Sequence, residues 1–185
     1  VRVTYVGELG WEFYFPMEYG TRPWDTLWAA GEPEGMVAAG YKAIDTLRLE
    51  KGYRYWGPDI SPDYTPYETG MGFAVKLAKG DFLGKEALVK QKATGIKQKL
   101  CCFSLSDATV IALGNEPILK NDKVIGWITS GGYGYSVKKS IAYGYLPIGE
   151  AKPGNEFETE WFGERLKLKV EAEPLYDPKG ERIKA

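Results

Sequence analysis

Glu12 is the ionisable residue whose sequence surroundings most strongly indicate a binding role. The segment VRVTYVGELGWEFYF, residues 1–15, has two runs with β propensity on either side of a Gly-Glu-Leu-Gly turn, which predicts a hairpin with a four-residue loop. In the predicted register Tyr5 lies directly opposite Glu12, and valines and a tyrosine share their face. A carboxylate in such apolar company must reach solvent or meet a group that donates hydrogen bonds, because burying an unpaired charge is costly.

The residue types that most often carry out catalysis or bind zinc are absent or unsuited here. The chain has no histidine, which excludes Ser-His-Asp and Cys-His catalysis and the usual zinc sites within these residues. Cys101 and Cys102 are adjacent in a strand-like run, where successive side chains point to opposite faces, so they form no disulfide framework and no CxxC pair. We expect two core residues in a reducing compartment, and no metal site.

The charge balance of the chain gives no electrostatic argument for nucleic acid or an anionic membrane. Of its 185 residues 24 are basic and 25 acidic, so the net charge is close to zero. No apolar run reaches the ~18 residues that would suggest a membrane span. The sequence lacks an initiator methionine and starts inside a strand pattern, which suggests a fragment of a longer protein.

Two helices are predicted to follow the hairpin. Residues 22–28 form the shorter one, with a proline in its first turn and Gly31 near its end. Residues 38–52 form the longer one, with an apolar stripe that ends at Leu49 and a C-terminal stop at Gly52. The stripe consists of Tyr41, Ile44, Leu47 and Leu49.

The middle of the chain has a more irregular pattern. Residues 53–72 combine three prolines with several aromatic residues, which predicts an ordered surface loop and not a flexible linker. Residues 72–78 resemble a strand, and residues 82–92 a basic helix. Seven lysines fall between Lys76 and Lys99, and we interpret them as the solvated face of that helix, the alternative being a phosphate-binding patch.

The last ninety residues have the pattern of a small barrel or sandwich. Short alternating runs are separated by Gly, Pro and Asn turns; they are KLCCFSL, NEPILKN, KVIGWITSGG, KKSIAYGYLP, NEFETEWF and RLKLKVE. We therefore predict an α+β protein with a boundary near residue 96. Residues 1–95 would form part of an antiparallel sheet with helices, and residues 96–185 a small antiparallel β-barrel.

Six segments in fixed order resemble the aminomethyltransferase family. This family comprises the T-protein of the glycine cleavage system and the folate-binding C-terminal regions of dimethylglycine and sarcosine dehydrogenases. The segments are YVGELGWE (residues 5–12), DTLRLEKG (45–52), TPYETG (65–70), KGDFLGK (79–85), ITSG (128–131) and AYGYLP (142–147). The resemblance covers almost the whole chain and implies a tetrahydrofolate-binding core followed by a C-terminal β-barrel.

The resemblance implies three folate-binding residues. Glu12 matches the family glutamate that holds the pterin, because one carboxylate can accept both the ring N–H and the exocyclic amine in a charge-assisted fork. Tyr5 matches a tyrosine of the same site. Trp56 could offer a flat face to the pterin or the aminobenzoyl ring, with packing as the equal alternative. Without the resemblance, a Glu12 that reaches solvent and a Tyr5 that merely packs would be the simpler interpretation.

The sequence departs from the T-protein pattern at Ile44, where T-proteins have an arginine that contacts the folate substrate. Together with GYKA (residues 40–43) and GGYGY (131–135), this departure resembles the dehydrogenase-linked branch. We interpret Arg48 and Glu50 as helix-surface and loop-bracing charges. Glu68 is expected to brace its loop, and Tyr176 to pack.

The resemblance implies a parent enzyme that transfers a one-carbon unit to tetrahydrofolate and forms 5,10-methylene-tetrahydrofolate. The carbon would come from an amine donor, which is lipoyl H-protein for T-proteins or the product of an upstream FAD domain in the dehydrogenases. The family's catalytic aspartate lies in the preceding half of the domain, so we expect no catalytic residue in this chain and expect the missing N-terminal part of the protein as a partner. We expect a cytoplasmic location, or the mitochondrial matrix in a eukaryote.

Three alternatives belong to other classes. One is a non-enzymatic folate-binding relative involved in iron–sulfur cluster assembly, which is disfavoured because Asp81 replaces the cysteine of the Lys-Gly-Cys-Tyr signature. Another is a folate-dependent demethylase of a sulfonium substrate. The third is an interaction module that kept the fold and lost the ligand, for which Ile44 is the best argument.

Overall fold

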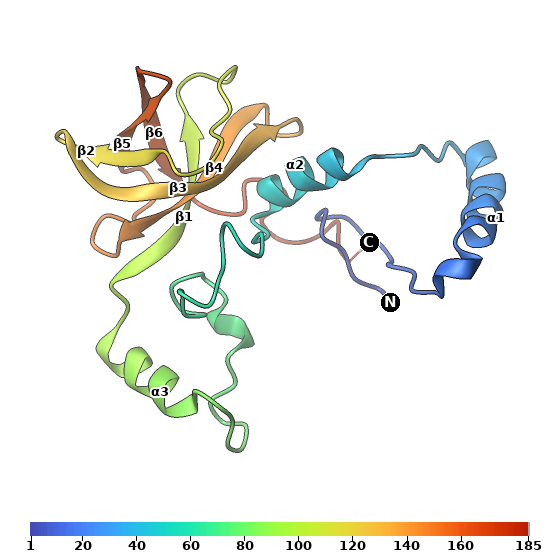
Figure 1. Ribbon diagram of the computed structural model, residues 1–185, viewed down its shortest axis with the longest axis horizontal. Coiled ribbons are helices and arrows are strands. Elements are labelled where there is room, and N and C mark those ends of the chain that lie inside the picture. Colours follow the sequence, from blue (N-terminus) through green and yellow to red (C-terminus); the bar gives the residue numbers. More distant parts are fainter. Residues whose placement is uncertain (185) are drawn as a thin grey trace.

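The helices of this chain precede all of its strands. The computed structural model describes residues 1–184. The helices are η1 Met17–Tyr19, α1 Thr21–Gly31, η2 Glu32–Glu34, α2 Tyr41–Lys51, η3 Gly72–Ala74 and α3 Lys85–Thr94. The strands are β1 Gln98–Leu105, β2 Pro117–Lys120, β3 Lys123–Gly134, β4 Lys139–Pro147, β5 Glu156–Trp161 and β6 Glu164–Glu171. The α+β class is confirmed, and Figure 1 shows the barrel, with α2 beside it and α1 and α3 extending away.

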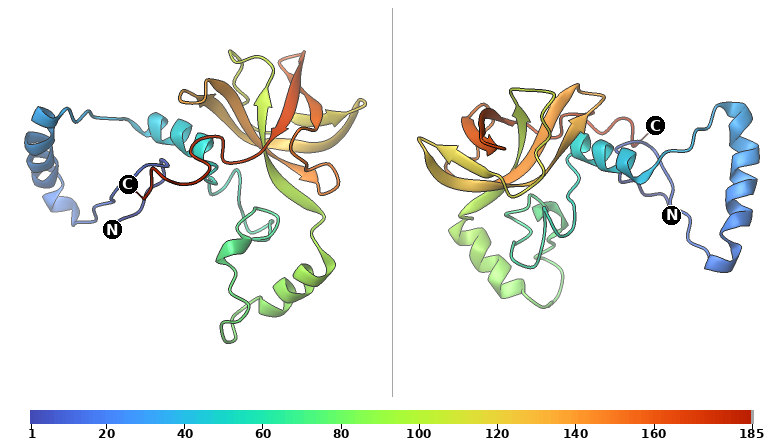
Figure 2. Two further views of the ribbon diagram at one scale, coloured as in Figure 1. Left: turned by 180° about the vertical axis from the view of Figure 1, so that it is seen from behind. Right: turned by 45° about the horizontal axis from the view of Figure 1, so that its top comes forward.

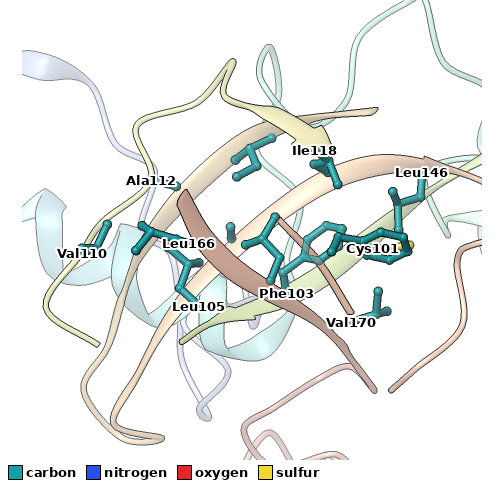
Figure 3. Packing of buried hydrophobic residues seen from close by; sticks show 13 residues of the cluster. Cys101, Phe103, Leu105, Val110, Ala112, Ile118, Leu146, Leu166 and Val170 are labelled. Carbon is teal, nitrogen blue, oxygen red and sulfur yellow. The ribbon is translucent and has the colours of Figure 1, made fainter. Parts of the chain in front are cut away.

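The six strands close into an antiparallel barrel in the order β1-β4-β3-β2-β5-β6. Its interior is an apolar cluster to which β1 contributes Cys101, Phe103 and Leu105, at the alternate positions that face inward. Figure 3 shows these side chains packed together with Ile118 of β2, across the barrel, and with Leu166 of the neighbouring strand β6. The pairing of β1 with β6 closes the sheet, and the predicted barrel is therefore confirmed.

A second apolar cluster lies outside the barrel, between the β1–β4 wall and α2. It consists of Leu49, Leu100, Cys102, Ile141, Tyr143 and Tyr145. Strand β4 is buried on both faces over seven consecutive residues, which explains its nearly continuous apolar sequence. Cys101 and Cys102 fall in different clusters and both are free and buried, as predicted.

Helix α2 confirms the predicted helix and its stop. Gly52 adopts the left-handed conformation, with φ 75°, and its N–H bonds back to the last turn. The predicted apolar stripe is confirmed in part, because Leu49 is buried and Ile44 and Leu47 are half-buried, but its first member, Tyr41, is 71% exposed. The buried residues are the last four, Arg48, Leu49, Glu50 and Lys51. Three of these are charged, and they can be buried because polar partners are supplied by residues 53–59, by the turn between β3 and β4 and by the C-terminal residues.

The first fifteen residues double back without forming the predicted hairpin, and no residue in this described stretch is assigned to a strand. Val1 lies opposite Glu12 and the two exchange backbone hydrogen bonds of 2.8 and 2.9 Å. The predicted pairing of Tyr5 with Glu12 is therefore wrong. The reason is tertiary, since Gly7, with φ 76°, packs against Lys51, and Leu9 N–H donates to the carbonyl of Arg182.

The predicted strand at residues 72–78 is also wrong. The segment forms η3 and turns, in which the N–H groups of Ala74 and Val75 donate to carbonyls three residues earlier, and no described strand lies beside it. Helices α1 and α3 confirm the predictions for residues 22–28 and 82–92, with shifted ends. Neither contains a buried residue, and both views of Figure 2 show α1 separated from the barrel. Within residues 1–184 no helix is both long and apolar enough to cross a bilayer.

Candidate functional site

Two adjoining cavities lie around residues 53–72, which we call the aromatic loop. The larger lies between this loop and residues 71–88. The smaller lies between the loop, the C-terminal end of α2 and residues 1–20, which we call the N-terminal segment. One has a volume of about 570 Å³ and is lined by Trp56. The other has a volume of about 440 Å³ and is lined by Tyr5. Ile60 and Met71 line both. Their sizes are typical of small-molecule sites, and their walls are mainly apolar and aromatic.

Tyr5 is fixed at the wall of the smaller cavity. Its hydroxyl donates to the backbone carbonyl of Arg54 at 2.5 Å, and its ring stacks on Tyr53 with centroids 5.8 Å apart. Burial raises the pKa of the Tyr5 phenol, against the positive charge of Arg48, which lowers it. The phenol is therefore neutral at physiological pH and its ring offers a flat apolar surface.

Trp56 lies at the exposed tip of the aromatic loop. Its side chain is 68% exposed. The loop closes through hydrogen bonds from Gly57 N–H to the Ile60 carbonyl and from Asp59 N–H to the Tyr55 carbonyl. The indole thus presents an open face at the rim of the larger cavity, where it could stack on a planar ligand.

Glu12 does not lie beside Tyr5 in this structure. Its side chain is exposed and accepts a hydrogen bond from the Tyr14 hydroxyl, and Glu12 lines neither of the two cavities. The structure therefore brings Tyr5 and Trp56 to adjoining cavities, and it leaves the carboxylate of Glu12 on the surface of the N-terminal segment.

A buried carboxylate that the sequence did not single out, Asp59, joins the aromatic loop to the barrel. It is completely buried. One of its oxygens accepts hydrogen bonds from the hydroxyls of Thr129 and Ser130 at 2.6 and 2.7 Å. The other accepts from Arg48 at 2.6 Å and from the Tyr55 N–H at 2.9 Å. Four donors from three parts of the chain therefore converge on one side chain.

Arg48 and Glu50 are buried, so their predicted position on the helix surface is wrong, although both brace loops as expected. Burial alone lowers the pKa of the Arg48 guanidinium, but Asp59 and Asp45 raise it above its ordinary value. The Glu50 carboxylate accepts the N–H groups of Ser136 and Val137, at 2.6 and 3.1 Å, and so holds the turn between β3 and β4.

The polar groups around the smaller cavity are engaged with one another. Arg54 pairs with Glu173 and donates to the Thr69 carbonyl at 3.0 Å. Lys51 pairs with Asp177 at 2.7 Å. Each of these cations has a carboxylate partner, so the arrangement suits binding of a planar molecule against aromatic walls better than proton transfer.

Two further predictions concern bracing residues. Glu68 accepts hydrogen bonds from the N–H and hydroxyl of Thr65, both 2.9 Å, which confirms that it braces its loop. Tyr176 packs as predicted, but its hydroxyl also donates to Glu8 and its N–H donates to the Glu50 carbonyl at 3.0 Å.

Sequence reasoning missed Asp59 because its side-chain partners are distant in the sequence. Arg48 lies eleven residues away, and Thr129 and Ser130 lie about seventy residues away. The one available signal was the segment ITSG, residues 128–131, which contains both hydroxyl partners. In the described part of the chain, no group of three or more His, Cys, Asp or Glu side chains is placed so that it could hold a metal ion.

Two family models match the chain on either side of α3. Residues 1–79 match the GCVT N-terminal domain, and residues 98–177 match the glycine cleavage T-protein C-terminal barrel domain. The chain belongs to the glycine cleavage T-protein family. The second match contains all six strands of the barrel.

Relatives with similar sequences are named either as dehydrogenases or as aminomethyltransferases. Human mitochondrial dimethylglycine dehydrogenase is 42% identical over 95% of this chain and 20% of its own length. Mouse mitochondrial sarcosine dehydrogenase is 38% identical over the whole chain and 21% of its own length. An aminomethyltransferase from Desulfitobacterium hafniense is 37% identical over 97% of this chain and 49% of its own length. The chain thus spans about a fifth to a half of these enzymes.

A solved T-protein structure has the same fold. The glycine cleavage system aminomethyltransferase T from Bartonella henselae superimposes with a TM-score of 0.88 at 28% identity, covering 96% of this chain and 49% of that one. The similarity includes the helical part as well as the barrel, since nearly all of the chain is aligned.

Proposed function

We propose that this chain is part of a tetrahydrofolate-dependent one-carbon transferase that forms 5,10-methylene-tetrahydrofolate. The observation that carries the proposal is the match of both halves of the chain to T-protein domains, together with two adjoining aromatic cavities where Tyr5 and Trp56 lie. Bound tetrahydrofolate would supply N5 and N10 as acceptors of the one-carbon unit.

The residues present fit a reduced folate in size and in aromatic surface. The cavities adjoin through Ile60 and Met71, so a long planar ligand can extend from one to the other. Tyr5 would form a wall for the pterin and Trp56 would stack on an aromatic ring. Glu12 would accept the paired N–H groups of the pterin, which requires its exposed carboxylate to leave Tyr14 and its part of the N-terminal segment to move towards the cavities, since it lines neither of them.

The chemical step would depend on residues outside this chain. The cations near Tyr5 are paired with carboxylates, and we assign no catalytic residue here. This chain would therefore bind and orient the folate, and the group that stabilises positive charge on the transferred carbon would come from another part of the full-length protein.

A second candidate is the folate-binding C-terminal region of a flavin-dependent dimethylglycine or sarcosine dehydrogenase. Identity of 42% to human dimethylglycine dehydrogenase, against 37% to the bacterial aminomethyltransferase, favours it. In this case an FAD domain would precede the chain and generate the amine-derived carbon. In the first case an aminomethyl group on lipoyl H-protein would be the donor.

The N-terminal segment also supports a protein partner. Its large exposed apolar side chains include Trp11, Phe13, Tyr14, Phe15 and Met17, and Trp24 of α1 adds to them. An apolar surface of this extent is usually covered. We propose that a preceding part of the same protein covers it. We place the protein in a bacterial cytoplasm, or in the mitochondrial matrix if it is eukaryotic, since two relatives are named mitochondrial.

The role of Glu12 can be tested by calorimetry of folinic acid binding to the full-length protein. Because a hydrogen bond to a charged group contributes about 1.5–3 kcal/mol, Glu12→Gln should weaken binding at least roughly tenfold. Glu18→Gln is the matched control, since it removes the same charge from another exposed position of this segment. Equal affinities of wild type and Glu12→Gln would refute the assignment of Glu12, and no binding by the wild type would refute the folate proposal.

A further inference from the structure

The end of the chain crosses the C-terminal turn of α2 and reaches the N-terminal segment. We call residues 173–182 the C-terminal strap. Its first residues, Glu173 and Pro174, line the smaller cavity together with Tyr5. Figure 1 shows this C-terminal stretch, in red, running past α2 towards the N-terminal residues, in blue.

Lys51 is the centre of this arrangement. Its ammonium donates to the carboxylate and to the backbone carbonyl of Asp177, both at 2.7 Å. The two side chains are 5% and 10% exposed. The stem of Lys51 packs against Gly7, where an added Cβ would lie 2.8 Å from Lys51 Cγ. One side chain thus holds the strap on one side and the N-terminal segment on the other.

The strap also contacts the N-terminal segment directly. Leu9 N–H donates to the Arg182 carbonyl at 3.1 Å, and the Tyr176 hydroxyl donates to Glu8. Asp177 shapes the strap for these contacts, because its carboxylate accepts the N–H groups of Glu181 and Arg182 at 2.9 and 3.2 Å. Residues 7–9 are therefore enclosed between α2 and the strap.

We propose that the strap is a clamp that sets the position of Tyr5 at the cavity wall, with Lys51 and Asp177 as positioning residues. Tyr5 precedes the clamped turn by two residues, and no residue from 1 to 15 is assigned to a strand, so the clamp holds the backbone next to Tyr5 whereas the contacts of its side chain are separate. Its own contacts are the Arg54 carbonyl and the Tyr53 ring. Opening the clamp would release the turn and widen the cavity, and the effect on ligand affinity rests on the proposed folate function.

Two variants open the clamp in different ways. Asp177→Asn removes the charge that Lys51 faces and keeps the size of the side chain. Gly7→Ala leaves every charge in place and forces the segment away from Lys51, both by the Cβ contact and by the positive φ. The matched control is Glu150→Gln, which removes an ion pair with Lys120 of the same 2.7 Å length on the barrel surface.

Hydrogen exchange followed by mass spectrometry on the full-length protein tests the clamp without any ligand. We expect both clamp variants to increase exchange at residues 5–9 by tenfold or more, with unchanged exchange in β1 and β4, and the control to change neither. Unchanged exchange at residues 5–9 in either clamp variant would overturn the proposal. An equal increase throughout the barrel would do the same, because it would indicate general destabilisation.

Folinic acid titration of the same proteins then tests the consequence for the site. The dissociation constant should rise about tenfold in both clamp variants and stay unchanged in the control. An unchanged dissociation constant in variants with an open clamp would overturn the positioning role. Failure of the wild type to bind folinic acid would count against the proposed function alone, because the exchange measurement decides the clamp independently.

Discussion

At the scale of single residues, the most consequential side chain is Asp59. It pairs with Arg48 inside the protein and accepts three further hydrogen bonds, so its charge is compensated completely by local donors. Such a pair contributes little net stability compared with an apolar substitute, but removal of one partner leaves the other charge buried and unpaired. This carboxylate joins the aromatic loop that carries Trp56 to β3, and hydrogen bonds from the Tyr145 hydroxyl to the Asp59 carbonyl and from Leu100 N–H to the Glu68 carbonyl join the loop to β4 and β1.

Asp59→Ala should therefore destabilise the protein by about 3–5 kcal/mol, because Arg48 would lose its buried partner. Urea unfolding followed by circular dichroism gives the change in the free energy of unfolding. Asp63→Ala is the control from the same loop, since Asp63 is exposed and bonds only to Ser61 among side chains. A loss below about 1 kcal/mol for Asp59→Ala would show that the loop is not held through this residue.

At the scale of elements, the strands were predictable and several contacts of the N-terminal part were not. Successive side chains of a strand point to opposite faces, so a strand with one solvent-exposed face, such as β5 or β6, has alternating polar and apolar residues. This alternation can be recognised from neighbouring residues alone. Helix α2 was predictable from another local signal, its stop at Gly52. The register of residues 1–15 was not, because contacts of Gly7 with Lys51 and of Leu9 with Arg182 determine it. Asp59 was missed because its partners are remote.

The contact between β3 and β4 requires glycine at Gly144. A Cβ at this position would lie 2.5 Å from the Trp127 carbonyl oxygen, which is backbone and cannot rotate away. We expect Gly144→Ala to cost about 1–3 kcal/mol or more through overpacking, measured as a lower midpoint of thermal unfolding. Gly149→Ala is the control, since no atom lies within 4 Å of its added Cβ and its φ is not positive. Equal midpoints for the two variants would contradict this account of the barrel.

At the scale of the whole molecule, the buried acidic groups make stability sensitive to alkaline pH. Burial raises the pKa of the Cys101 thiol to about 11 and that of Cys102 to about 12, and it also raises the pKa of Tyr143 and Tyr145. These groups stay neutral in the folded protein and ionise at lower pH in the unfolded chain. The stability that the two neutral thiols contribute is complete below their unfolded pKa of about 8.5 and is lost progressively as the pH rises above it.

The free energy of unfolding should accordingly decrease between pH 8.5 and 10.5. Each thiol contributes a slope that approaches about 1.4 kcal/mol per pH unit, because it releases a proton only on unfolding. Urea titrations at several pH values measure this slope. Cys102→Ala should reduce the slope by the share of one thiol, whereas stability that does not change with pH over this range would show that the thiols are accessible in the folded state.

The hydrogen bond between Leu9 and Arg182 has a practical consequence for anyone who attaches a label or a fusion protein. It holds residues 7–9 and the C-terminal strap together next to Tyr5, so that a label or insert placed in either stretch would lie beside the cavity. The exposed turn at Phe162 and Gly163, between β5 and β6, is a safer place for a fluorophore or an inserted epitope.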